Sequence, residues 1–224
     1  MRPFSSGCLA RNDWVCGEYL RSRRPELVDA LVQHITLTLV SVAIGLVIAI
    51  PLAVVARRLG VTQVVLGTAT VLYTIPSVAL FSLFIPFTGI SATTVVIGLV
   101  LYSLTVLVRN ALAGLAAVPA EVLESARGMG MGPTRMLLRV ELPLAVPTIM
   151  AGVRIATVST VALTTVGGII DNGGLGNLIF SGLQSTFRAQ VLAAAALCVV
   201  LAVIADLALL GVQRMVTPWL RAVQ

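Results

Sequence analysis

Residues 124–143, with the sequence ESARGMGMGPTRMLLRVELP, carry charged side chains in a chain that is otherwise mostly apolar. Glu124 and Arg127 lie in a stretch that suits a short helix beginning near Pro119, because proline is favoured in a first turn and acidic side chains stabilise the positive end of a helix. The glycines after Arg127 end this helix. Pro133 suits the first turn of a second helix. The pattern predicts a helix-turn-helix that presents methionine and leucine among charges, as a docking surface does.

The composition around this segment indicates an integral membrane protein. Of 224 residues, 58% are hydrophobic and 11% are charged, and the mean hydropathy is +1.04. Soluble domains carry roughly 25% charged residues, and disordered chains combine low hydrophobicity with high charge, so both classes are excluded. The net charge of +6 comes with only 5% aromatic residues. In a membrane protein basic residues mainly set orientation, so no nucleic-acid partner is expected.

Apolar runs predict about five membrane spans, since about 20 helical residues cross a bilayer. The expected spans cover residues 35–56, 61–87, 94–108 with an extension towards 115, 144–166 and 190–212. The second is expected to be one span broken or kinked at Pro76, because each of its two pieces is too short to cross alone. The predicted fold is therefore all-α, with a polar loop over residues 116–143.

Three regions follow from this pattern. Residues 1–31 are expected to form an N-terminal tail with an amphipathic helix on the membrane surface near residues 25–32. Residues 32–213 form the transmembrane domain, and residues 214–224 a cytoplasmic tail. No signal peptide is evident, so the first apolar run is expected to remain as a span.

The side of the membrane on which the N-terminus lies is left open. Five spans place the Arg-bearing segments 57–58, 109–139 and 214–221 on one face, which the positive-inside rule assigns to the cytoplasm. The N-terminal tail then lies outside, although it carries five arginines. A six-span arrangement that splits residues 61–87 would place the tail inside.

The state of the two N-terminal cysteines depends on the side of the membrane on which the tail lies. Cys8 and Cys16 form a disulfide if the tail is extracytoplasmic, or they are two free thiols in a mobile tail; both readings stay open. Cys198 lies in an apolar run and is expected to be a small residue that faces lipid or protein. His34 precedes the first span and is expected at the membrane interface.

The residue inventory excludes several kinds of catalysis. All 15 basic residues are arginine. A Walker A loop requires a lysine, and so does Schiff-base chemistry. His34 is the one histidine, whereas histidine-based metal clusters need several and a Ser-His-Asp triad would need a suitable serine near it in the fold. The sequence therefore predicts no catalytic residue, no metal site and no enzyme.

The polar segment resembles the cytoplasmic loop of permease subunits of binding-protein-dependent ABC importers. That loop reads Glu-Ala-Ala, three residues, glycine, nine residues, an aliphatic residue, any residue, Leu-Pro. Glu124, Ala126 and Gly130 match in identity and spacing. Residues 140–143 close the pattern, and Ser125 replaces the middle alanine with another small side chain. The resemblance implies the transmembrane-domain fold of a type I ABC importer and a coupling helix that fits a groove on the ATPase. The implied coupling residues are Glu124, Ser125, Ala126, Gly128, Gly130, Leu142 and Pro143.

A wider resemblance points to the osmoprotectant branch of these permeases. It rests on residues 74–81, 101–104 with 108–110, 126–131 and 173–176. It implies import of glycine betaine, choline, carnitine or a similar quaternary amine across the bacterial cytoplasmic membrane. A permease for another small solute, such as methionine or a sulfonate, is the nearer alternative. A secondary transporter or channel acting alone is the other, but it would not need the docking loop.

The resemblance also implies a set of partners. These are a second permease subunit, identical or homologous, two cytoplasmic ABC ATPases and an extracytoplasmic substrate-binding protein. ATP and Mg²⁺ belong to the ATPases, so no cofactor is expected in this chain. A quaternary ammonium is usually held by an aromatic cage, yet both tryptophans, Trp14 and Trp219, lie in the tails. Tight selection of the solute is therefore expected in the binding protein.

Two groups of residues inside apolar runs are candidates for function. The first lies near the break in the second span and could line a pathway or simply pack around a proline kink; its members are Tyr73, Thr74, Pro76, Ser77 and Tyr102. The second group is Arg154 and Asp206, because intramembrane charges are functional candidates and usually pair. The alternative is that these two side chains reach separately to the membrane surface.

Overall fold

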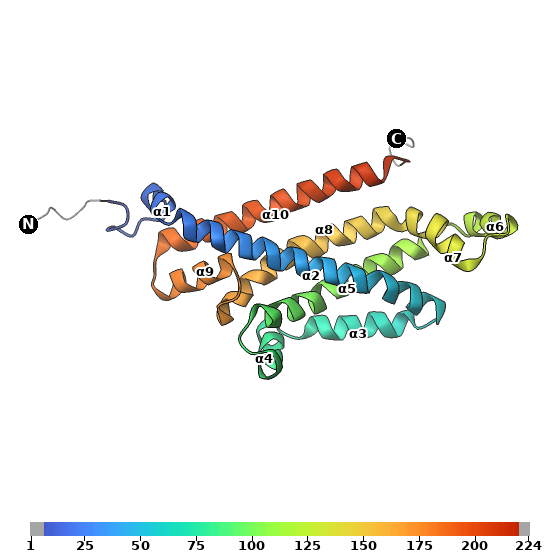
Figure 1. The fold of residues 1–224 in the computed structure, drawn as a ribbon, viewed down its shortest axis with the longest axis horizontal. Helices are drawn as coiled ribbons and strands as arrows, with labels where there is room; N and C mark the ends of the chain where they lie inside the picture. The colour runs from blue at the N-terminus through green and yellow to red at the C-terminus, as the bar shows by residue number, and fades with distance from the viewer. Residues whose placement is uncertain (1–6, 220–224) are drawn as a thin grey trace, which may run out of the picture. The chain divides into compact units, whose positions relative to one another are not determined.

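The computed structural model describes residues 7–219, and these residues contain helices and no strand. The helices run in the order α1 (Gly17–Ser22), α2 (Arg24–Arg58), α3 (Thr62–Thr74), α4 (Ser77–Thr88), α5 (Ala92–Ala116), α6 (Ala120–Gly128), α7 (Pro133–Met136), a π-helical turn η1 (Leu137–Glu141), α8 (Leu142–Val166), a 3-10 turn η2 (Gly167–Ile170), α9 (Leu175–Gln184) and α10 (Arg188–Val216). Figure 1 shows this order along the ribbon.

Within the described residues, four stretches of helix are long and apolar enough to cross a membrane. They are α2, α5, the run Pro133–Ile170 and α10, and α3 with α4 adds a fifth as a broken span or a re-entrant loop. The predicted all-α membrane fold with about five spans is therefore confirmed. The four continuous spans are each longer than the predicted apolar run, because helical hydrogen bonding continues into the polar flanks.

The start of α2 differs from the prediction. Residues 25–32 are not a separate surface helix but the first turns of α2, which is continuous from Arg24 to Arg58. Pro25 does not interrupt it, because a proline is tolerated in the first turn, where its missing N–H would have no partner. The boundary drawn between residues 31 and 32 therefore falls inside a helix.

The break at Pro76 is present. Helix α3 stops at Thr74, and α4 resumes at Ser77 with Pro76 in extended backbone before it (φ −58°, ψ 135°). Proline has no backbone N–H and pushes the preceding residue out of the helical region. The two pieces have 13 and 12 residues, fewer than the roughly 17 that a span needs.

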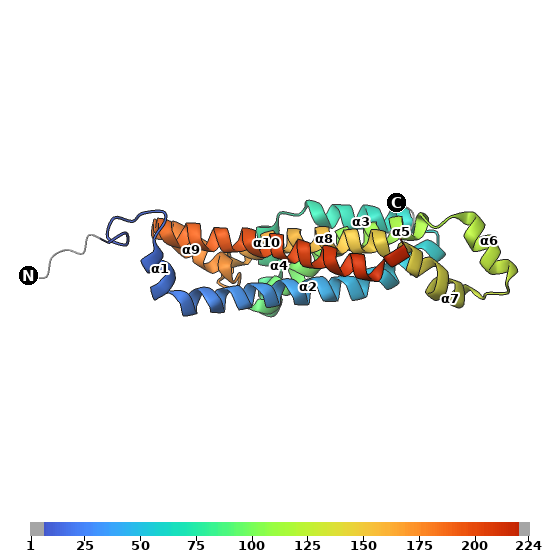
Figure 2. The ribbon, with the colours of Figure 1, turned by 90° about the horizontal axis from the view of Figure 1, so that it is seen from above.

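Contacts divide the chain into two compact units. The first comprises the described parts of residues 1–41, 75–99 and 158–204, and the second those of residues 42–74, 100–157 and 205–224. In the second unit, α2, α5 and α8, labelled in Figures 1 and 2, share one core. Alanines such as Ala53, Ala111 and Ala145 are buried in it. Small residues allow helices to approach closely in a membrane. Gly114 illustrates this, since a Cβ there would lie 2.9 Å from the carbonyl oxygen of Ala145.

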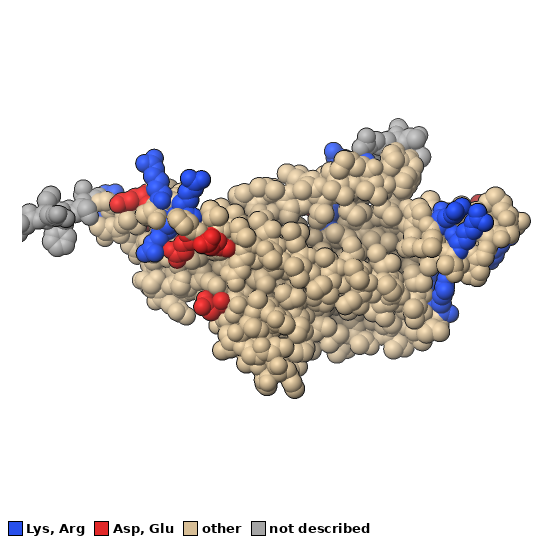
Figure 3. Space-filling view, in the orientation of Figure 1, with Lys and Arg blue, Asp and Glu red and all other residues tan. Residues whose placement is uncertain are grey.

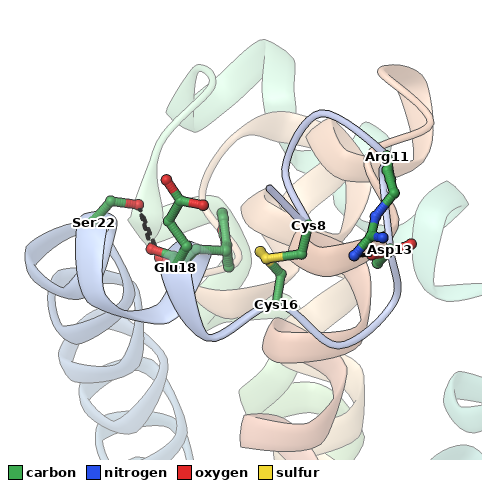
Figure 4. The surroundings of a disulfide bond; sticks show 7 residues. Cys8, Arg11, Asp13, Cys16, Glu18 and Ser22 are labelled. Atoms are coloured by element: carbon green, nitrogen blue, oxygen red, sulfur yellow. Dashed lines mark hydrogen bonds and ion pairs between the residues drawn. A yellow bond between two sulfur atoms is a disulfide. The ribbon is translucent and has the colours of Figure 1, made fainter. Parts of the chain in front are cut away.

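In the first unit, the N-terminal segment is held against the turn between α9 and α10. Cys8 and Cys16 form a disulfide with a Cα–Cα distance of 5.5 Å (Figure 4). Asn12, within the ring that this bond closes, donates from Nδ2 to the Thr186 carbonyl oxygen at 2.8 Å. Its Oδ1 accepts the Arg188 N–H at 2.9 Å. The side chain of Asn12 therefore bonds to both sides of the turn.

Aromatic side chains reinforce this attachment. The Tyr19 and Phe187 rings meet edge to face at a centroid distance of 5.2 Å. The Arg188 guanidinium lies over the Trp14 ring at 5.6 Å. Burial is the main cause that raises the pKa of the Tyr19 phenol above 10.0. We call residues 7–22, with their disulfide, the N-terminal clasp.

Candidate coupling and pathway residues

The predicted helix-turn-helix is present in the second unit as α6 and α7, which project past the ends of α5 and α8 (Figures 1 and 2). Pro119 precedes α6 in extended backbone, and Pro133 is in the first turn of α7. Helix α6 ends where Gly130 adopts a positive φ of +76°, a conformation that costs other residues roughly 1–2 kcal/mol. The Gly130 N–H donates to the Arg127 carbonyl oxygen at 2.9 Å and closes the turn.

A small apolar core holds α6 on α7. Leu123, Ala126 and Met136 are buried in it together with Val118. Within the coupling pattern, Ala126 therefore lies underneath the segment. The residues of the pattern on its exposed surface are Glu124, Ser125, Gly128 and Gly130.

The coupling segment continues into α8 through the π-helical turn Leu137–Glu141. Leu142 packs against the core of the second unit and begins α8, followed by Pro143. From Pro133 onward the helical structure is continuous through α7 and η1 into α8. Arginine side chains gather over α6 and α7, as Figure 3 shows in blue.

Glu141 is a functional candidate that sequence reasoning missed. It is only 8% exposed, and its carboxylate forms an ion pair with the Arg57 guanidinium at the end of α2. A buried carboxylate needs such a partner. Opposite charges in two polar segments were the only signal in the sequence, and 84 residues separate the partners.

Of the pathway candidates, the structure brings together Tyr73 and Tyr102. Their rings meet edge to face with centroids 5.7 Å apart. Thr74 donates from Oγ1 to the Val71 carbonyl oxygen of its own helix at 2.7 Å. Pro76 and Ser77 form the start of α4 and belong to the first unit.

Further contacts tie α3 to α5 beside the two tyrosines. The Thr105 hydroxyl donates to the Ala69 carbonyl oxygen at 3.0 Å. Arg109 donates from Nη2 to the Thr70 hydroxyl, also at 3.0 Å. The side chains of Thr70 and Tyr73 in α3 thus contact α5.

The structure also brings Arg154 and Asp206 together. Nε and Nη2 of Arg154 donate to Oδ1 and Oδ2 of Asp206 at 2.8 and 2.9 Å. The two side chains are 26% and 34% exposed. Gln213 extends the network, since its Oε1 accepts from Arg154 Nη1 at 3.5 Å and its Nε2 donates to the Pro147 carbonyl oxygen at 3.4 Å. Both charges are therefore engaged between α8 and α10 rather than reaching separately to a membrane surface.

His34, which the sequence predicts at the membrane interface, is fully buried inside the first unit. Its Nδ1 lies 3.2 Å from the Gly173 carbonyl oxygen and its Nε2 lies 3.0 Å from that of Val161. A neutral imidazole has one N–H and therefore donates to one of these two carbonyls. The ring lies between the glycine-rich turn before α9 and helix α8.

Residues 41–222 match the family model described as the binding-protein-dependent transport system inner membrane component. The chain belongs to this family. Several relatives of this inner membrane component are similar to it along nearly the whole chain. The choline transport system permease protein OpuBB of Bacillus subtilis is 34% identical over 202 residues, 90% of this chain and 93% of the relative.

Two more relatives give the same picture. The osmoprotectant import permease protein OsmW of Salmonella typhimurium is 34% identical over 206 residues, 89% of this chain and 96% of the relative. The glycine betaine/carnitine/choline transport system permease protein OpuCB of Bacillus subtilis is 33% identical over 201 residues, 89% of this chain and 93% of the relative.

A solved structure shares the fold of this inner membrane component. It is an inward-facing conformation of the MetNI methionine ABC transporter, with a TM-score of 0.79 and 23% identity over 88% of this chain and 98% of that one. The chain thus has the transmembrane-domain fold of a type I ABC importer. It is the permease subunit of an ABC importer, a multi-pass protein of the bacterial inner membrane.

Proposed function

We propose that this permease subunit conducts a compatible solute, namely glycine betaine, choline, carnitine or a similar quaternary amine. The observation that carries the proposal is the 34% identity over about nine-tenths of the chain to permeases named for choline and osmoprotectant transport. The chain offers few aromatic side chains for an ammonium cage, so we assign tight selection of the solute to a separate binding protein. A weakly binding pathway beside Tyr73 and Tyr102 is consistent with selection by a separate binding protein.

The proposed complex contains a second permease, identical or homologous, two cytoplasmic ATPases that bind ATP and Mg²⁺, and an extracytoplasmic substrate-binding protein. The binding-protein-dependent character of the family supports the last of these. The absence of lysine supports a separate ATPase, because a Walker A loop cannot be built from this chain.

In this proposal the exposed face of α6 docks into a groove of the ATPase. Glu124, Ser125, Gly128 and Gly130 make the contact, while Ala126 beneath them holds α6 on α7. Closure of the ATPase pair then moves α6 and α7. Because helical structure continues through η1 to Leu142 and Pro143, that movement reaches α8 directly.

Uptake by the reconstituted complex tests the solute. Radiolabelled glycine betaine, choline and carnitine are measured with and without ATP, with methionine and a sulfonate as unlabelled competitors. ATP-dependent uptake of at least one quaternary amine, unaffected by the competitors, is the expected result. Inhibition of the labelled uptake by methionine or by the sulfonate would refute the solute class, and uptake without any ATPase would refute the importer.

Two glycines of the turn test the coupling role separately. Gly130→Ala places a side chain at φ +76° and should distort the exposed face of the turn. Gly132→Ala is the matched control, since Gly132 has φ −67° and nothing lies within 4 Å of a Cβ there. We expect Gly130→Ala to lower uptake several-fold at unchanged membrane insertion and Gly132→Ala to leave it intact. Equal uptake by both variants would refute the docking role.

A further inference from the structure

A cavity of about 250 Å³ lies in the second unit, between the coupling segment and the end of α2. Its apolar wall includes Leu115 and Met136, and its polar wall consists of Arg57, Arg58, Arg127 and Glu141. None of the seven residues of the coupling pattern lines it. The cavity is therefore separate from the surface proposed to meet the ATPase.

The charges in this cavity do not balance. Three arginines and one glutamate give a net charge of 3 − 1 = +2. Glu141 is engaged by Arg57. Arg58 and Arg127 form no ion pair within residues 7–219. Two guanidinium groups thus line the cavity without an ion-pair partner among the described residues, and a guanidinium binds phosphate oxygens with two parallel hydrogen bonds.

The cavity lies at the ends of membrane helices. Arg57 and Arg58 end α2, and Leu115 is in the last turn of α5. A position at the end of a span is the depth of lipid head groups. The arginines after the spans assign this face to the cytoplasm by the positive-inside rule, and the cytoplasmic leaflet is rich in anionic lipids.

We propose that this cavity binds the phosphate head group of an anionic phospholipid of the cytoplasmic leaflet. The phosphate is held by Arg58 and Arg127, and the apolar wall contacts the glycerol and the first acyl carbons. Arg57 is held by Glu141, so its role is to keep the end of α2 next to the coupling segment. The proposal does not depend on the identity of the solute.

Native mass spectrometry of the purified full-length chain tests the site, with phosphatidylglycerol as the probe and phosphatidylcholine as the zwitterionic reference. Arg58→Gln with Arg127→Gln should weaken phosphatidylglycerol binding by about tenfold or more, the effect of losing charge-assisted hydrogen bonds. Arg135→Gln with Arg139→Gln is the matched control, since these exposed arginines on the same segment do not line the cavity. It should change binding by less than about twofold.

Three outcomes would overturn the proposal. Equal losses in both double variants would mean that any surface arginine attracts the lipid. Equal binding of phosphatidylcholine would remove the role of charge. Displacement of phosphatidylglycerol by inorganic phosphate at equal concentration would identify a soluble anion instead of a lipid as the ligand.

A second pair of variants separates binding from misfolding. Arg58→Lys with Arg127→Lys keeps the charge but loses the two-pronged geometry. We expect the wild-type melting temperature and intermediate affinity for phosphatidylglycerol. The full complex gives a further check: if adding the ATPase subunits releases the lipid, the cavity is a docking site for the ATPase, and the lipid proposal is wrong.

Discussion

Arg154 and Asp206 each lie within a membrane-spanning helix, where an unpaired charge is costly. Two parallel hydrogen bonds join them. Each charge therefore offsets part of the free-energy cost of placing the other in the membrane. Removing one partner leaves the remaining charge exposed to an apolar surrounding. The pair should therefore behave as a unit in mutagenesis.

We predict that Arg154→Met and Asp206→Leu each lower the free energy of unfolding, because each leaves one charge without the partner that it has in the native structure. Arg154→Met combined with Asp206→Leu should cost less than the sum of the two corresponding single changes, because neither charge is left alone. Denaturant unfolding in detergent micelles measures each free energy of unfolding. Additive losses would show that the two side chains are not coupled.

His34 is the second residue with a strong expected effect. His34→Phe keeps an aromatic ring but removes the N–H that donates to the carbonyl oxygen of Gly173 or of Val161, and should cost about 1–3 kcal/mol. His34→Gln keeps a donor and should cost less. Thr36→Val on the same helix is the control, because Thr36 is exposed and bonds only to its own helix at Val32. The melting temperature of the purified chain ranks the three; a His34→Phe protein as stable as Thr36→Val would contradict the prediction.

For single residues, the sequence predicted the partners of isolated intramembrane charges better than those of neutral side chains. Arg154 and Asp206 stand out because charge is rare in an apolar run. The burial of His34 could not be predicted, since its partners are two distant backbone carbonyls. That of Gly173 lies 139 residues away in a turn, and that of Val161 lies 127 residues away in α8. Glu141 was similarly hidden, because several other charges of the same segment looked equivalent to it.

The contact between α5 and α8 depends on two glycines that let the helices approach. A Cβ on Gly152 would overlap the side chain of Asn110, and one on Gly114 would press on Ala145. Gly152→Ala should force the helices apart and cost about 1–3 kcal/mol, as overpacking does. Gly211→Ala in α10 meets nothing within 4 Å and should be neutral or stabilising by up to about 1 kcal/mol.

Melting temperatures of the two glycine variants test this contact directly. The same measurement on both proteins, expressed at equal levels, compares a buried helix contact with an exposed helix face. If Gly211→Ala lowered the melting temperature as much as Gly152→Ala, helix approach would not be the cause.

Among the elements, the lengths of the apolar runs and the positions of proline predicted the spans and their breaks correctly. The short helix α9 was not predicted. The break at Pro76 and the turn between α6 and α7 follow from backbone chemistry that the sequence displays. Helix α9 was missed, although Leu175, Leu178 and Ile179 repeat at helical spacing. The glycines before it look like an extended loop, and only packing against the rest of the first unit makes residues 175–184 helical.

For the molecule as a whole, the N-terminal clasp bears on the orientation that the sequence left open. A disulfide persists in an oxidising compartment, so the Cys8–Cys16 bond favours an extracytoplasmic N-terminus and, with five spans, a cytoplasmic C-terminus. This orientation contradicts the arginine count of the tail but agrees with that of the other segments.

We predict that, after reduction, Cys8 and Cys16 react in intact spheroplasts with a maleimide that cannot cross the membrane. A cysteine introduced by Met215→Cys, near the end of α10, should react only after the membrane is permeabilised. Cys8→Ser combined with Cys16→Ser in the Met215→Cys protein is the control for the tail. The reverse labelling pattern would place the N-terminus inside.

The clasp also has a consequence for the order of biogenesis. Cys8 and Cys16 are eight residues apart, so their ring can close soon after the tail has been exported. Asn12 can bond to Thr186 only later, because Thr186 is 174 residues further along the chain and emerges late from the ribosome. The disulfide-closed loop of the clasp thus forms first, and the α9–α10 hairpin packs onto it at the end of synthesis. Cells that lack an extracytoplasmic thiol oxidant should accumulate a chain whose first spans are inserted normally but whose final hairpin is sensitive to protease.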